Sequence, residues 1–211
     1  MINLSGLDLT DLNEFVNQPS DHIHSFMSTF TEAIFQNGPD SFVPMLSIFK
    51  TKNEMAISIE CRPFKDKDDM YKAYAEMLHY FSAADAHSFI IANDVRMSIY
   101  KQDDPHSKKQ DATDALSLSF VSSDSSGLLT LPYRIVDNQV LWSQKDFSLT
   151  NLTEDDPTKT FQGEMVELFY TMSHLDGPLF TIPQLLNYLS YKKFQYILPD
   201  SSKLNSIKVK L

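Results

Sequence analysis

The sequence is poor in cysteine, in glycine and in long apolar runs, and each shortage excludes a class of protein. The one cysteine in 211 residues, Cys61, cannot form an intramolecular disulfide, which agrees with a reducing compartment. Five glycines leave no Gly-rich loop to cradle a phosphate. No segment approaches the ~20 apolar residues that a membrane helix needs, and the first residues lack the basic and apolar regions of a signal peptide. We therefore expect no membrane insertion and a cytoplasmic location, in a cell or in an infected host.

Basic residues are also scarce, and they are distributed unevenly. The formal net charge is −10, and no Lys or Arg precedes Lys50, although that stretch holds Asp8, Asp11, Glu14, Asp21, Glu32 and Asp40. The last 21 residues carry five lysines against Asp200 alone. Affinity for nucleic acid depends largely on neutralising phosphates, so we expect no nucleic-acid partner.

Apolar periodicity predicts helices and a hairpin in the first half of the chain. A short helix is expected over 10–16, and a longer one from Ser20 or Asp21 to Asn37, where Gly38-Pro39 ends it. Strands over 43–49 and 55–61 form a hairpin, and Asp66 opens a helix that reaches Phe81. The first strand is apolar nearly throughout, which suits burial on both faces. We expect two helices to cover one face of the sheet with a shared core, comprising Phe26, Phe30, Met70, Tyr74 and Phe81.

The second half predicts a meander and then helices. A strand over 88–100 is expected to bend or break near Asn93-Asp94, and 101–113 is a polar loop. Strands over 116–120, 129–135 and 140–142 follow, with Asp137-Asn138 as a tight turn. Pro132 requires an edge strand or a non-bonded position. Helices are expected over 161–172 and 181–189, and the alternation after Pro199 favours a strand.

These elements predict an α+β fold with an antiparallel sheet, made of a hairpin plus a meander. N-terminal and central helices pack on the sheet, and a C-terminal helix pair follows. We expect a single domain over 1–211, with a C-terminal helical subregion at 158–198 and a basic tail at 199–211.

The residues that carry chemistry do not form a convincing catalytic or metal-binding motif. His22 and His24 are two residues apart and so face different sides of a helix, and Cys61 lies in the apolar register of its strand. The alternative is a metal-dependent nuclease or phosphoesterase that uses Asp40 and Glu60, because the predicted hairpin brings them near each other. Together with Arg62 they resemble the P-D…(D/E)-x-K pattern of restriction-type nucleases. Arg replaces the Lys of that pattern and cannot deprotonate to activate water.

The last two predicted helices could also be interpreted as a DNA-binding helix-turn-helix, but the distribution of basic residues argues against this. The start of the second helix, 181–189, has no basic residue, although a recognition helix contacts bases with its N-terminal residues. The architecture is similar to that of bacterial secretion chaperones and adaptors, and equally to that of phage structural proteins. Such a likeness concerns the fold and not the function.

We therefore expect a non-enzymatic protein-binding component of a larger assembly: an adaptor, a secretion-type chaperone or a structural subunit. No cofactor and no metal is expected, and the partner is another protein or further copies of the chain. The tail combines lysines with apolar residues in alternation, as a segment does that adds a strand to a sheet edge. The expected partner-binding residues are Lys203, Leu204, Ile207, Lys208, Val209, Lys210 and Leu211.

Overall fold

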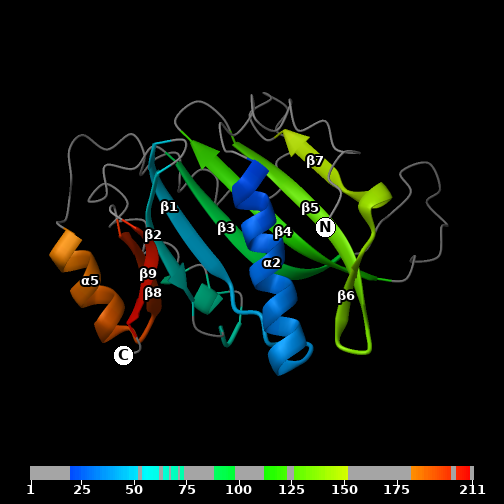
Figure 1. Ribbon diagram of the computed structural model, residues 1–211, viewed down its shortest axis with the longest axis horizontal. Coiled ribbons are helices and arrows are strands. Elements are labelled where there is room, and N and C mark those ends of the chain that lie inside the picture. Colours follow the sequence, from blue (N-terminus) through cyan, green and yellow to red (C-terminus); the bar gives the residue numbers. More distant parts are fainter. Residues whose placement is uncertain are drawn as a thin grey trace.

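One antiparallel sheet organises the described part of the chain. The computed structural model describes residues 20–51, 54–61, 64–66, 68–70, 72–73, 88–97, 112–122, 126–151, 182–200 and 203–209. Its nine strands have the order β6-β5-β4-β3-β1-β2-β8-β9, and β7 also pairs with β5. The hairpin is β1 (Met45–Thr51) with β2 (Glu54–Glu60), and the meander is β3 (Ser88–Met97), β4 (Thr113–Ser122), β5 (Ser126–Val136) and β6 (Gln139–Trp142). Hairpin and meander join because β1 pairs with β3 (Figure 1).

Helix α2 (Ser20–Asn37) covers one face of the sheet, as its apolar spacing predicts. Its buried side chains pack against alternate residues of β1, β3, β4 and β5, among them Phe49, Ile90, Leu118 and Leu131. The helix ends at Gly38, which has a φ of +90° and donates its N–H to the carbonyl of Ile34 at 2.8 Å.

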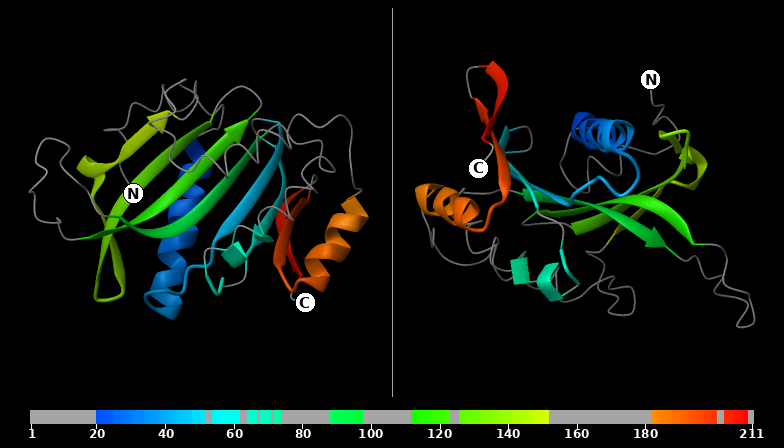
Figure 2. Two further views of the ribbon diagram at one scale, coloured as in Figure 1. Left: turned by 180° about the vertical axis from the view of Figure 1, so that it is seen from behind. Right: turned by 90° about the horizontal axis from the view of Figure 1, so that it is seen from below.

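The opposite face of β1, β2 and β3 is buried in a second apolar cluster. Leu46, Ile57, Ile91 and Cys61 belong to it, together with residues of α5 (Ile182–Tyr191). Met70 packs against this cluster, from the helical stretch that Asp66 caps by accepting a hydrogen bond from the N–H of Asp69 at 2.8 Å. Figure 2 shows α2 and this stretch on opposite sides of the sheet.

The prediction that Phe26, Phe30 and Met70 share one core is therefore wrong. Phe26 and Phe30 lie in the α2 cluster, whereas Met70 packs against the other one; Tyr74 and Phe81 lie outside the described residues. The physical reason is that β1 and β3 carry apolar residues on both faces, such as Met45 and Leu46 in β1 and Ile90 and Ile91 in β3, so both faces of these strands must be covered.

A β-bulge in β2 changes which face its first residues occupy. Ile48 lies opposite Ile57 while Phe49 lies opposite Met55, so Ala56 is an extra residue in β2. Met55 consequently packs with the α2 cluster, whereas Ile57 and Ile59 face the other side. Regular alternation between the two faces therefore holds in β2 only beyond the bulge.

β5 accommodates Pro132 because its neighbouring edge strand is interrupted there. β6 pairs with residues 133–136 and β7 (Ser148–Asn151) with residues 127–130, and the 3-10 turn η2 (Gln144–Asp146) lies between them. The carbonyl of Pro132 accepts the N–H of Ser143 at 2.8 Å, so its backbone points away from β4. No bond of the β4–β5 ladder is lost, and the non-bonded position is confirmed.

Other boundaries depart from expectation in specific places. β3 runs without a break through Asn93 and Asp94, which pair with Ser117 and Leu116 of β4. Of the C-terminal helix pair only α5 is described; 161–172 and the helix over 10–16 lie outside the described residues. So does the predicted loop over 101–113 as far as residue 111, and Thr113 already belongs to β4. Part of the predicted helical subregion is a strand, β8 (Gln195–Asp200), which pairs with β2. No described helix is long and apolar enough to cross a membrane.

α5 ends in a two-bond cap with a lysine in the left-handed conformation. Lys193 has a φ of +61°, and its N–H bonds to the carbonyl of Ser190 while that of Phe194 bonds to the carbonyl of Leu189. Leu189 and Phe194 are both buried in the same cluster, the apolar contact that accompanies this cap. The turn directs the chain into β8.

We predict that Phe30→Ala lowers the free energy of unfolding by ~3–5 kcal/mol, because the Phe30 side chain is fully buried. Phe35 in the same helix is 64% exposed, so Phe35→Ala is the matched control and should cost less than ~0.5 kcal/mol. Urea titrations measure both values. Equal losses for the two variants would contradict the placement of α2.

We predict that Lys193→Gly raises the free energy of unfolding by about 0.5–1 kcal/mol. Glycine removes the steric cost of a Cβ at positive φ, partly offset by its larger entropy in the unfolded chain. Lys193→Ala keeps the Cβ and should bring no such gain. A glycine variant no more stable than the alanine variant would contradict the left-handed cap.

Candidate functional site

The carboxylates of the nuclease hypothesis lie on different sides of β1. Met45, at the start of β1, pairs with Glu60 of β2 on one side and with Ala92 of β3 on the other. Glu60 also pairs with Gln195 of β8, whereas Asp40 acts electrostatically on Asp94 of β3. Arg62 lies outside the described residues. Within the described ranges, no group of three or more His, Cys, Asp or Glu side chains could hold a metal ion.

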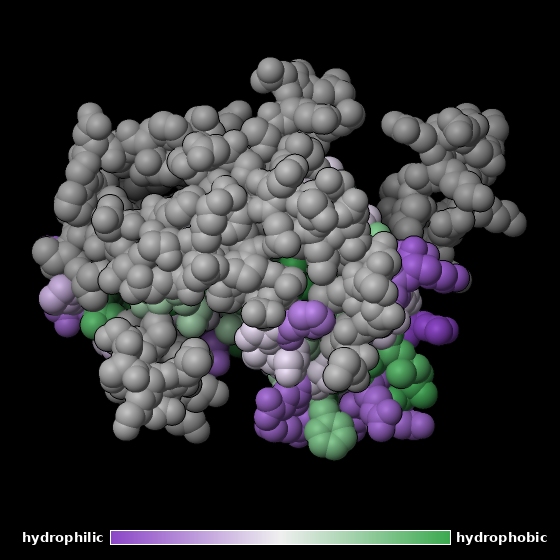
Figure 3. Space-filling view, turned by 45° about the horizontal axis from the view of Figure 1, so that its top comes forward, coloured by the Kyte–Doolittle hydropathy of each residue, from purple (hydrophilic) through white to green (hydrophobic). Residues whose placement is uncertain are grey.

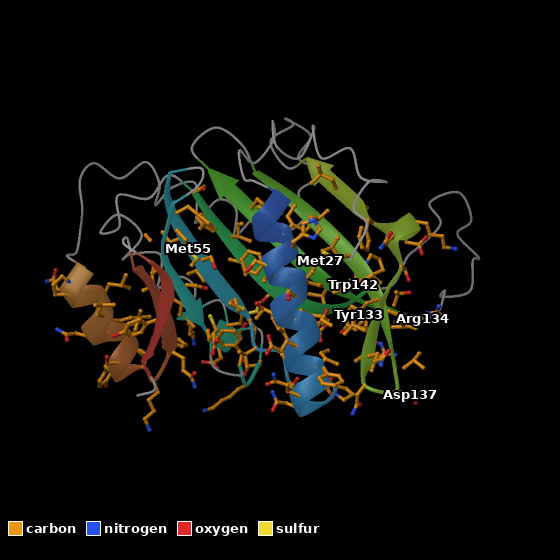
Figure 4. The ribbon with its side chains drawn as sticks, viewed as in Figure 1. Met27, Met55, Tyr133, Arg134, Asp137 and Trp142 are labelled. Atoms are coloured by element: carbon orange, nitrogen blue, oxygen red, sulfur yellow. The ribbon has the colours of Figure 1, made fainter. Side chains whose placement is uncertain are left out.

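A hydrogen bond between a tyrosine and an aspartate joins two strands on the face of the sheet that α2 covers. The hydroxyl of Tyr133 on β5 donates to Oδ1 of Asp94 on β3, at 2.7 Å, across β4. The Tyr133 ring is buried edge-on against Phe30 and Trp142, with centroids 4.9 and 5.8 Å away. Figure 4 shows Tyr133 and Trp142 beside α2.

The charges around this bond are mainly acidic. Burial raises the pKa of Asp94, the hydrogen bond from Tyr133 lowers it, and the carboxylates of Asp114 and Asp40 raise it. Burial and the bond to Asp94 raise the pKa of Tyr133 far above its ordinary value. Arg96 lies 3.9 Å from Asp114, but both side chains are exposed and the pair contributes little.

This arrangement is suited to holding strands together rather than to acid–base chemistry. A tyrosine with a raised pKa stays protonated near neutral pH and acts as a hydrogen-bond donor. Its partner carboxylate is engaged by that donor. The two residues are 39 positions apart in the chain, so no local sequence signal pairs them. The only trace is that Asp94 follows the buried Ile90 and Ala92 on the same face of β3.

The expected partner-binding tail forms the outermost strand at one edge of the sheet. β9 (Lys203–Val209) pairs antiparallel with β8 of the same chain, and includes Lys203, Leu204, Ile207, Lys208 and Val209. Lys210 and Leu211 lie outside the described residues. The sheet edge to which the tail adds a strand is therefore that of its own domain. Among the described strands, β9 has β8 as its only neighbour.

The opposite edge of the sheet, beside β5, is shaped by residues that the sequence analysis did not single out as functional. There the edge is divided between β6 and β7, and the interruption by η2 follows from Pro132 and Ser143. Interrupted edges offer a poor template for another strand along most of their length. A prediction from sequence missed this because β7 has only four residues and no distinctive pattern.

We predict that Asp94 makes the protein less stable as pH rises from about 4 to about 7. Its raised native pKa means that the folded state binds the proton more tightly than the unfolded state, so this contribution is lost as the carboxyl ionises. Asp94→Asn should therefore gain stability relative to the parent over this range in urea titrations. The gain is modest because Asp94 is partly exposed. An NMR titration that places the pKa of Asp94 below its ordinary value would contradict the prediction.

No protein-family model, curated protein or solved structure matches the chain.

Proposed function

We propose that the protein is a non-enzymatic binding component of a larger assembly, an adaptor, chaperone or structural subunit. In this proposal an extended segment of a partner protein adds to the sheet along β9. The observation that carries it is the position of β9 at the end of the strand order, with β8 on one side and no described strand on the other.

Backbone geometry supports strand addition at this edge. Successive residues of a strand direct their N–H and C=O groups to opposite sides, so β9 presents alternate groups away from β8. An added strand completes that ladder, while its side chains supply specificity.

Charge indicates the kind of partner. β9 contains Lys203 and Lys208 and no acidic residue, although the chain as a whole carries a net charge of −10. An acidic segment would be steered to this edge, and the attraction would be screened by salt.

A pair of proline substitutions tests this edge with an internal control. Ile207 and Lys208 are consecutive and both in register with β8, opposite Leu198 and Ile197. One of Ile207→Pro and Lys208→Pro therefore removes an N–H from the β8–β9 ladder, and the other removes one from the open edge. The ladder variant should have the lower urea midpoint.

We predict that the open-edge variant keeps the parent's stability but no longer retains the proteins that the tagged parent captures from its native host. Capture by the parent should weaken as salt rises from about 50 to about 500 mM. Mass spectrometry of the co-eluting proteins, quantified against the parent, provides the measurement. Undiminished capture by both proline variants would contradict a role for this edge.

A further inference from the structure

The outer side of β6 presents backbone groups that no described strand engages. Val136 and Gln139 flank the two-residue turn Asp137-Asn138, whose φ values of +50° and +59° fit a tight hairpin turn. Residues 139 and 141 therefore bond to β5, as does Ser143, whose N–H reaches Pro132. By alternation, the N–H and C=O groups of Val140 and Trp142 point away from β5.

Apolar side chains are exposed beside this free edge. Val136 and Leu141 are 48% and 45% exposed, and the register places them with Arg134 and Gln139 on the hairpin face turned away from α2. Figure 3 shows green apolar side chains between purple polar ones in this region, at the lower right. β6 itself, Gln-Val-Leu-Trp, has no charge and no proline, the usual residues that prevent edge pairing.

We propose that β6 pairs with β6 of a second copy of this chain, around a twofold axis perpendicular to the sheet at Leu141. A twofold axis perpendicular to the sheet does not exchange its two faces. Each residue of β6 therefore lies opposite a residue of the second copy whose side chain is on the same face. Leu141 then faces Leu141 of the second copy. Val140 and Trp142 face Trp142 and Val140 of the second copy and exchange the hydrogen bonds that their outward groups offer.

Charge complementarity favours a second copy as the occupant. In this register the turn residue Asp137 of one copy lies toward Lys145 in η2 of the other, and the axis makes the contact twice. Both side chains are exposed, and Figure 4 places Asp137 at the tip of the hairpin. A twofold interface must be self-complementary, and this edge meets that condition in backbone, apolar and charged groups.

Disulfide trapping tests the register directly. Leu141→Cys would place two cysteines in a non-hydrogen-bonded antiparallel pair, with a Cα separation of roughly 4.5–5.5 Å that suits a disulfide. The native Cys61 is buried and does not compete. Arg134→Cys is the control, because Arg134 is exposed on the same face but lies on β5, one strand back from the edge.

We expect Leu141→Cys to form the disulfide-linked dimer at least about tenfold faster than Arg134→Cys under mild oxidation. Comparable rates would mean random collision and would overturn the proposal. The test involves only β6 and β5, at the opposite end of the sheet from β9, so its outcome is independent of the proposed strand addition there.

Association without a covalent bond provides the second measurement. An interface formed by the four-residue strand β6 is small, and small protein–protein interfaces are weak. Sedimentation should therefore show the mass rising from 24.1 kDa toward twice that value only at protein concentrations of about 10–500 μM. The single tryptophan, Trp142, should change its emission over the same range. Leu141→Lys should stay monomeric with the parent's urea midpoint. A parent that remains monomeric throughout, or a Leu141→Lys variant that still associates, would overturn the proposal.

Discussion

The arrangement of the described chain depends on the burial of both faces of β1 and β3. Leu46 and Ile48 face one cluster while Met45 and Phe49 face the other, and β3 continues both rows. A strand of this kind cannot lie at an edge, because each face needs its own cover and each side needs a neighbour. This explains why the hairpin and the meander join at β1 and β3, and why α2 and α5 lie in different clusters.

A sheet built outward from such a centre must end somewhere, and its two ends differ. At one end, η2 interrupts the edge opposite Pro132 and divides it between the four-residue strands β6 and β7. The other end is the seven-residue β9, which carries two lysines. An interrupted edge strand and lysines on an edge strand both limit unspecific pairing with the edges of other sheets. They leave room for selective pairing, which depends on register in the first case and on charge in the second.

Sequence patterns predicted the elements that neighbouring residues specify. They failed where contacts between residues distant in the sequence determine the structure. The stripe from Ile23 to Ile34 and the turn at Asp137-Asn138 were predicted, because spacing and turn chemistry specify them. The face of Met55 was not predictable, since the bulge at Ala56 is visible only against β1. β8 was missed because its short apolar run lies between Lys193 and Pro199, which suggested a helix end and a tail. The contact of Asp94 with Tyr133 joins β3 to β5, and no pattern within either strand indicates it.

Two hydrogen bonds between polar side chains connect strands of the sheet. Ser47 and Ser58 share a hydrogen bond of 2.9 Å between β1 and β2, and Tyr133 donates to Asp94. Both bonds lie within the sheet, and the two binding proposals rest instead on the backbone groups of its described edge strands, β6 and β9. The two proposed edges also combine, because pairing through β6 would place a β9 edge at each outer end of one continuous sheet. A dimer of that form presents its partner-binding strand twice, and a partner with two acidic segments would bind it more tightly than either edge alone, provided that its linker spans the sheet.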